Sequence, residues 1–358
     1  MKQKIGILLA AIVLCGCTSM GPRSVRQSHG LYGQAISLSL NEQFLQNLVR
    51  LRYRESPYFL EVGSVTSSMT FESNLGMESA LSTGGGSGIL GPAVGAGYSN
   101  SPTISYSPLQ GEDFFRKMLV AVPLESLFVL MRSGWNAKRV FGICVEQING
   151  LENAPSASGP TPARPPGDTS DFERLLELLD SVRHTEAIQS SIDTNTQKLQ
   201  VRFESTPSNA SALAELRSLL GLASDKSEFA VTSNALERDS GTLVIRTRSI
   251  MSILFYMSQT VDVPKKHKDA GMVVTTLHPD GSTFAWEETP AGRKFRIQQS
   301  SRRPRSAYLA VPYRDHWFYI ANNDLDSKAS FMLMSQLFSL NAGAIKSVNP
   351  TLTIPVGR

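Results

Sequence analysis

The sequence predicts an α+β protein, with a helical N-terminal region that carries a long amphipathic β-hairpin, followed by a mixed α+β domain. Apolar residues recur at helical spacing before residue 150, except in residues 62–108, where apolar and polar residues alternate. Short strand patterns and short helix patterns follow one another from residue 171 onward. The length of 358 residues and the hydrophobic fraction of 41% suit one large domain or two ordinary ones.

The first residues have the three parts of a secretory signal peptide. Lys2 and Lys4 give a positive start, an uninterrupted apolar run covers residues 5–14, and a short cysteine-containing motif follows. The apolar run is far shorter than the roughly 20 apolar residues that a membrane-spanning helix needs. We therefore predict that residues 1–16 are a signal peptide that is removed on export.

The motif Leu14-Cys15-Gly16-Cys17 resembles the bacterial lipobox. The resemblance implies that diacylglycerol is attached to the Cys17 thiol, that the chain is cut after Gly16, and that an acyl chain such as palmitate is added to the new amine. Several acyl chains, at about 0.8 kcal/mol per buried CH₂, give stable anchoring. Because Thr18 and not Asp follows Cys17, the sorting pattern favours the outer membrane, and we expect the periplasmic face. The alternative is an ordinary signal peptide cut nearby, with Cys17 left as a free thiol.

The region after the anchor is predicted to change from a tether to helices. Residues 17–40 contain Gly21, Pro22, Gly30 and Gly33 and are predicted to be a flexible tether. A capping box at residues 39–42 then begins a helix that is expected to end near Pro57. Further helices are predicted at residues 112–119, 124–133 and 137–148. Residues 41–153 thus form the helical region that carries the hairpin at 62–108.

The sharpest pattern in the sequence is the alternation within residues 65–106. The apolar residues occupy odd positions in 65–81 and even positions in 94–106, and the segment between them reads STGGGSGILGPA. This pattern predicts a long two-faced β-hairpin with a glycine-rich tip. The face expected to contact a membrane or a partner carries Val65, Met69, Phe71, Leu75, Met77, Tyr98, Ile104 and Tyr106.

Residues 154–170 read APSASGPTPARPPGDTS, with five prolines and little to bury, and are predicted to be a linker or a long exposed loop. The α+β domain is then expected at 171–358. Within it the apolar helix at 249–260 is too short to span a bilayer and is expected in the core. Other helices are predicted to begin near residues 170, 210 and 327. Strands are predicted at 199–203, 242–247, 272–277, 282–286 and 295–299, and a hairpin at 308–320 that turns near Arg314-Asp315.

Composition argues against several classes of protein. Without Lys2 and Lys4, the 35 Lys and Arg residues fall to 33 against 31 Asp and Glu, which gives no indication of nucleic-acid binding. Cys15 leaves with the signal peptide and Cys17 is acylated, so only Cys144 remains and no intramolecular disulfide can form. The apolar neighbours of Cys144 predict a small buried residue and not a nucleophile.

The sequence contains none of the motifs GxSxG, SxxK, HExxH or Walker A. No histidine lies at metal-ligand spacing from another His or Cys. Asp315 and His316 could act together only in a turn, because neighbouring strand residues point to opposite faces. We therefore expect no catalytic residue, no metal and no cofactor, and a non-enzymatic protein is favoured over an enzyme.

Several segments resemble parts of a group of uncharacterised predicted bacterial lipoproteins. The segments are residues 102–109 (PTISYSPL), 133–135 (SGW), 316–320 (HWFYI) and 326–328 (DSK). The resemblance would span most of the mature chain. It implies a lipoprotein of the cell envelope but no known activity and no site residues.

Two classes of function remain open. The first is a lipid-anchored scaffold or assembly factor, held on the membrane by acyl chains, that binds an envelope protein or other copies of itself. The second is an oligomeric outer-membrane pore or export component that inserts the 65–106 hairpin. The first is favoured because Ser67, Ser73 and Ser79 interrupt the apolar face that lipid would require.

The lipid anchor can be tested by replacing the acceptor thiol. A Cys17→Ser variant offers no thiol to diacylglycerol, so we expect an uncleaved precursor that incorporates no labelled fatty acid. Metabolic labelling with palmitate and gel mobility measure this, and a Cys144→Ser variant serves as the matched control that is labelled normally. Normal labelling of Cys17→Ser would contradict the lipoprotein prediction.

Overall fold

The structure, a computed structural model, describes residues 20–78, 91–160, 165–182, 187–192, 198–342 and 352–355. The chain divides into two compact units. Unit 1 comprises Met1–Tyr58 and Gln110–Ile345, and unit 2 comprises Phe59–Leu109 and Lys346–Arg358. Helices and mixed sheets both contribute, which confirms the predicted α+β class. Within the described ranges no helix is both long and apolar enough to cross a membrane.

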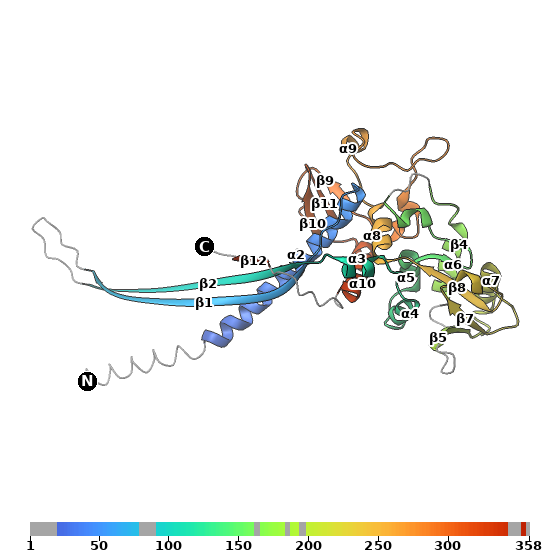
Figure 1. The fold of residues 1–358 in the computed structure, drawn as a ribbon, viewed down its shortest axis with the longest axis horizontal. Coiled ribbons are helices and arrows are strands. Elements are labelled where there is room, and N and C mark those ends of the chain that lie inside the picture. The colour runs from blue at the N-terminus through green and yellow to red at the C-terminus, as the bar shows by residue number, and fades with distance from the viewer. Residues whose placement is uncertain are drawn as a thin grey trace, which may run out of the picture. The chain divides into compact units, whose positions relative to one another are not determined.

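Unit 1 contains the long helix α2, Met20–Arg52 (Figure 1). The predicted flexible tether is therefore wrong for residues 20–40. Pro22 lies in the first turn, where a missing N–H is tolerated, and Gly30 and Gly33 each cost only about 1 kcal/mol relative to Ala. The C-terminal half of α2 compensates for these residues by burying Phe44, Leu45, Leu48, Val49 and Leu51.

A six-stranded mixed sheet forms one part of unit 1. Its strand order is β4-β3-β8-β7-β6-β5, and β7 and β8 are its parallel pair. In β6 the buried Leu199, Val201 and Phe203 alternate with Gln200 and the exposed Arg202, so one face of this strand lies on the core. The strands are β3 (Val145–Ile148), β4 (Leu151–Glu152), β5 (Ile188–Ile192), β6 (Leu199–Phe203), β7 (Glu228–Thr232) and β8 (Thr242–Thr247).

A three-stranded antiparallel sheet, in the order β10-β11-β9, forms another part of unit 1. Its strands are β9 (Gln298–Ser300), β10 (Ala307–Tyr313) and β11 (His316–Ala321). The turn from β10 to β11 has Arg314 in the left-handed region, with φ 53°. The predicted hairpin and its turn are confirmed.

The helix α8 (Ile250–Ser258) is buried along nearly its whole length, as predicted. Its N-terminus is capped by Ser249, whose Oγ accepts from the Ser252 backbone N–H at 3.1 Å. The other helices are α3 (Glu112–Leu119), α4 (Leu124–Arg132), α5 (Ala137–Cys144), α6 (Ser170–Ser181), α7 (Ala210–Leu220), α9 (Lys265–Asp269) and α10 (Leu325–Ala342).

Two predicted strands, at 272–277 and 282–286, do not form. These segments share a single β-bridge between Leu277 and Thr283. The indole Nε1 of Trp286 donates to Thr276 Oγ1 at 3.1 Å, and the chain turns into a 3₁₀-helix at Trp286–Glu288. The pairing is therefore limited to this one bridge, and the 3₁₀-helix follows it in the chain. The strand predicted at 295–299 is also shorter than expected, and forms as β9.

The predicted linker at 154–170 does not separate two folding units. The six-stranded sheet takes β3 and β4 from before this segment and β5 to β8 from after it, and both sides belong to unit 1. Residues Pro155–Ser158 form a 3₁₀-helix in which Ala157 is buried. The prolines suggested a linker because they remove N–H donors, but the carbonyls of the segment remain able to accept hydrogen bonds.

Arg248 supplies the donors that hold the start of this segment. Its guanidinium is 1% exposed and donates to the carbonyl oxygens of Val145 at 2.6 Å, of Ala154 at 3.2 Å and of Asn153. Its Nε donates to Ser158 Oγ at 3.2 Å. The guanidinium carbon lies 4.2 Å from the centre of the Tyr256 ring on α8, within cation–π range.

Unit 2 is a long antiparallel hairpin of β1 (Leu60–Glu78) and β2 (Gly91–Pro108), with the short strand β12 (Leu352–Pro355) beside β2 (Figure 1). The register pairs Val65 with Ile104, Phe71 with Tyr98, and Leu75 with Val94. These are positions of the two predicted apolar rows, so the register agrees with the sequence pattern. The side chains of residues 64–102 lie outside the described part of the structure.

We expect Arg248→Met to lower the free energy of unfolding by about 3–5 kcal/mol, because several buried carbonyls lose their donor together. Arg246→Met, in the adjacent strand β8, is the matched control. Arg246 is 53% exposed and pairs with Glu146 at 3.0 Å, and such a surface pair is worth about 0–1 kcal/mol. Urea denaturation measures both variants, and equal destabilisation would contradict the role given to Arg248.

Candidate functional site

The predicted site residues lie partly outside the described structure. Cys17 falls on residues that the structure does not describe. The eight predicted hairpin residues all lie in β1 and β2, and among them only Ile104 and Tyr106 have described side chains, both half-buried. Cys144 ends α5 and is buried, as predicted, and burial raises the pKa of its thiol to about 12. It therefore stays protonated and is not an activated nucleophile.

A polar cluster in unit 1 joins the end of α2, the helix α9 and the β10–β11 turn. His267 of α9 is buried, and its Nε2 lies 2.8 Å from Asp315 Oδ1. The same Asp315 oxygen lies 3.1 Å from His316 Nδ1. The other ring nitrogen of His267, Nδ1, lies 2.7 Å from the Tyr53 hydroxyl. The ligand atoms of His267, Asp315 and His316 lie within 4.8 Å of one another, a spacing that could hold a metal ion.

The charges around the cluster favour neutral histidines. Burial, followed by the nearby His316, Lys266 and Arg314, lowers the pKa of His267. Burial and then Lys266 lower the pKa of His316. Lys266 also forms an ion pair with Asp315 through Oδ2, the carboxylate oxygen that faces away from the hydrogen bonds to the histidines. Neutral imidazoles are the form that binds transition metals.

Aromatic packing holds Tyr53 in position. Its ring lies 5.0 Å from that of Tyr313 and 6.2 Å from that of Phe318, centre to centre. The Arg314 guanidinium lies 5.2 Å from the centre of the Tyr53 ring and pairs with Glu55 at 3.1 Å. Burial raises the pKa of Tyr53 to about 12, so the hydroxyl remains protonated at neutral pH.

Sequence reasoning missed this cluster because His267 and Asp315 lie 48 residues apart. One local signal was present, since Asp315 and His316 were expected to meet only in a turn, and the structure does place the turn at Arg314. The buried His267 had no local signal. Its three lysine neighbours in KKHKD indicate a solvent-exposed segment, yet the imidazole lies inside.

A second feature of unit 1 is a cavity of about 260 Å³. Its lining includes Arg52 and Lys268, which are the sequence neighbours of Tyr53 and His267. Its walls come from the end of α2, residues 259–263, Lys268 of α9, and residues 275–276, 283–287 and 295–296. They combine hydroxyl, aromatic and charged side chains. The principal polar and aromatic members are Arg52, Thr260, Asp262, Lys268, Thr276, Trp286, Phe295 and Arg296.

Arg52 is the unusual residue in this cavity. It is 9% exposed, and burial lowers the pKa of its guanidinium to about 10. Its Nη1 donates to the Val274 carbonyl at 3.0 Å, but its buried Nε has no hydrogen-bond partner, and no carboxylate of the described residues forms an ion pair with it. By contrast, Arg296 in the same wall pairs with Asp262 at 2.9 Å. Arg52 is therefore a buried cation that, among the described residues, has no ion pair.

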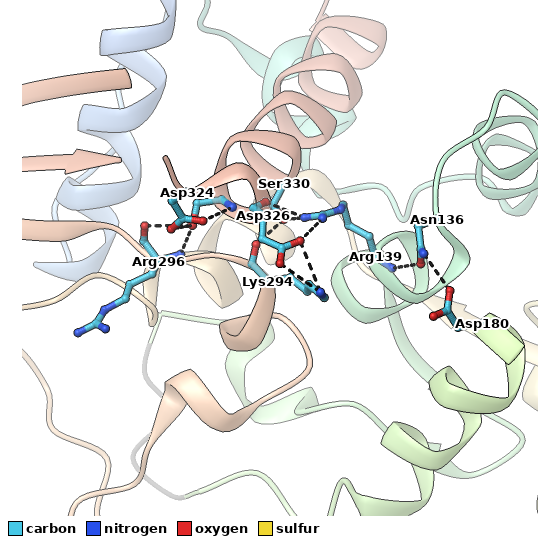
Figure 2. Close-up of polar contacts among 9 residues, drawn as sticks. Asn136, Arg139, Asp180, Lys294, Arg296, Asp324, Asp326 and Ser330 are labelled. Carbon is cyan, nitrogen blue, oxygen red and sulfur yellow. Dashed lines mark hydrogen bonds and ion pairs between the residues drawn. The ribbon is translucent and has the colours of Figure 1, made fainter. Parts of the chain in front are cut away.

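Residues 294–296, which include the wall residues Phe295 and Arg296, are held by the polar network drawn in Figure 2. Asp326 at the start of α10 lies between Arg139 of α5 and Lys294, with oxygen–nitrogen distances of 2.5 and 3.3 Å. Ser330 donates to the Lys294 carbonyl at 2.7 Å and accepts from Arg139. The Arg296 backbone N–H donates to Ser327 Oγ at 2.9 Å. These bonds tie the cavity wall to two helices.

Comparison of the chain with models of protein families, with curated proteins and with solved structures found no significant match.

The unpaired state of Arg52 predicts an unusual tolerance. Because the buried charge has little compensation, we expect Arg52→Met to leave the free energy of unfolding within about 1 kcal/mol of wild type or to raise it. This would contrast with the large loss expected for Arg248→Met. Urea denaturation in buffer without multivalent anions measures it. A loss comparable to that of Arg248→Met would show that Arg52 is a structural residue.

Proposed function

We propose that the chain is a lipid-anchored protein of the cell envelope that acts as a non-enzymatic scaffold or assembly factor. Acyl chains on Cys17 would hold it on the outer membrane. The hairpin of unit 2 would then be the element that binds an envelope protein or another copy of the chain. The lipobox and the signal-peptide pattern support the location, and the geometry of the hairpin supports the binding role.

The observation that carries the proposal is the open edge of the hairpin. Among the described residues, β1 pairs with β2 on one side and with no strand on the other. The other edge of β2 is paired only where β12 lies against residues 103–106. Most of both outer edges therefore presents backbone N–H and C=O groups without a strand partner in the described structure.

Such edges favour the addition of another strand. An isolated two-stranded hairpin is marginally stable in water, and an open edge is a template for pairing with another chain. Strand addition supplies affinity through backbone hydrogen bonds, and side chains at alternate positions supply specificity. A hairpin of this length that lacks a full third strand is thus well suited to dock on a partner.

The pore or export component remains the alternative proposal, and one observation favours it. A transmembrane strand needs about 9–11 residues, whereas β1 has 19 and β2 has 18. In this alternative the open edges would be paired by hairpins of neighbouring copies in the membrane. The serines on the apolar face argue against it.

The scaffold proposal predicts a discrete neighbour along β1. A photo-crosslinking residue placed at Thr66 or Thr70 in intact cells should give one or two defined products, which mass spectrometry identifies. The matched control is the same residue at Leu236, which is 94% exposed in unit 1. Absence of any product from both β1 positions, with the control equally silent, would contradict a docked hairpin.

Charge on one face separates the two proposals. If the hairpin spans a bilayer, Phe71→Arg or Met77→Arg should cost about 2–4 kcal/mol near the midplane and abolish insertion, whereas Thr70→Arg and Gly76→Arg should be tolerated. Protease protection of the hairpin in proteoliposomes measures insertion. If the hairpin docks on protein, all four variants should stay membrane-bound through the lipid, and the first pair should lose the crosslinks. Equal crosslinking in all four would contradict both proposals.

A further inference from the structure

We propose that His267, Asp315 and His316 form a binding site for a divalent transition-metal ion such as Zn²⁺, with Tyr53 as the residue that orients His267. This site lies in unit 1 and is independent of the role proposed for the hairpin. Two imidazoles and one carboxylate are a common three-residue ligand set for Zn²⁺ and similar ions, and they leave a further position for water or another ligand.

The geometry needs only small adjustments to accept the ion. Zn–N and Zn–O bonds of about 2.0–2.2 Å in tetrahedral geometry place the ligand atoms roughly 3.3 Å apart. The two nitrogen-to-carboxylate distances are already 2.8 and 3.1 Å. All three ligand atoms lie within 4.8 Å of one another. An ion between them would replace the hydrogen bonds that Asp315 Oδ1 now accepts.

The Tyr53 hydroxyl can pair with His267 Nδ1 whether or not that nitrogen carries the proton, so His267 can adopt either tautomer. Without a metal ion, His267 can donate from Nε2 to Asp315 while its Nδ1 accepts from the Tyr53 hydroxyl, 2.7 Å away. When Nε2 binds a metal ion, the proton must be on Nδ1, and the same tyrosine oxygen can accept it because a phenol is both donor and acceptor. Partners of this kind fix the tautomer of metal-binding histidines.

The residues around the site leave a route for a metal ion and place a lysine beside the carboxylate. His267 is buried, but the Asp315 side chain is 50% exposed, so an ion can enter from the solvent side. Lys266 pairs with Asp315 Oδ2 and leaves Oδ1 facing the imidazoles. The lysine would then neutralise the outer side of a metal-bound carboxylate. Two imidazole nitrogens and one carboxylate oxygen suit a transition metal and not Ca²⁺ or Mg²⁺, which need several oxygen ligands.

The test is metal titration of the full chain, purified without a histidine tag and stripped with chelator. We expect Zn²⁺ to bind with one-to-one stoichiometry by calorimetry, and Co²⁺ to give the visible absorption of a low-coordinate site. His316→Ala and Asp315→Asn should each weaken binding at least tenfold. Tyr53→Phe should weaken it by about 10–100-fold, as partners of metal ligands do. His278→Ala, in the turn at residues 278–281, is the matched control and should bind like wild type.

Several results would overturn the site. Absence of Zn²⁺ and Co²⁺ binding by the folded wild type would do so, as would one-to-one binding that survives in a His267→Gln, His316→Ala double variant. Circular dichroism of each metal-free variant checks the fold. Because the Asp315 side chain is 50% exposed in the β10–β11 turn, the Asp315→Asn variant keeps the test valid even if substitution of His267 or His316 unfolds the protein.

Discussion

In unit 1 a fully buried arginine, Arg248, donates hydrogen bonds to carbonyl groups of segments that are distant from it in the sequence. The acceptors come from the end of α5, from residues 153–154 and from the 3₁₀-helix at Ser158, while Tyr256 of α8 covers one face. Asn153 extends the network, because its Nδ2 donates to the Gly142 and Val145 carbonyls at 2.9 and 2.7 Å. The five N–H donors of a guanidinium in one plane suit this arrangement, which a lysine could not reproduce. Sheet, helix and proline-rich segment are thereby fixed to one another.

A second buried arginine, Arg52, has far fewer hydrogen-bond acceptors around its guanidinium than Arg248 has. Arg52 and Arg248 both carry a pKa lowered by burial. Arg248 has backbone acceptors on both of its terminal nitrogens, whereas Arg52 bonds to one carbonyl and lines a cavity. Burying a charge is costly unless it is compensated. Arg248 therefore joins distant segments of the fold. Arg52 leaves a buried positive charge that has no ion pair among the described residues and lies beside a cavity.

Local sequence patterns predicted the secondary-structure elements whose formation depends on neighbouring residues. The alternation in β6, the apolar run of α8 and the turn of the β10–β11 hairpin all follow from neighbouring residues, and all are found. The proline-rich linker was misread because its partner, Arg248, lies some 95 residues further along the chain. The tether was misread because burial at the far end of α2 sustains the helix through its glycines. The His267–Asp315 contact spans 48 residues and depends on how α9 packs against the β10–β11 turn, which no local pattern records.

The short strand β12 has a consequence for the order in which the molecule assembles. It lies against residues 103–106 of β2, yet the whole second part of unit 1 comes between these two strands in the chain. Contacts of such large sequence separation form late, because a long loop must close first. During folding, the base of the hairpin therefore stays two-stranded until the residues of unit 1 that precede β12 have been synthesised. Until then another chain can pair with the same edge and compete with β12, so the late position of β12 in the chain leaves this edge open to strand addition.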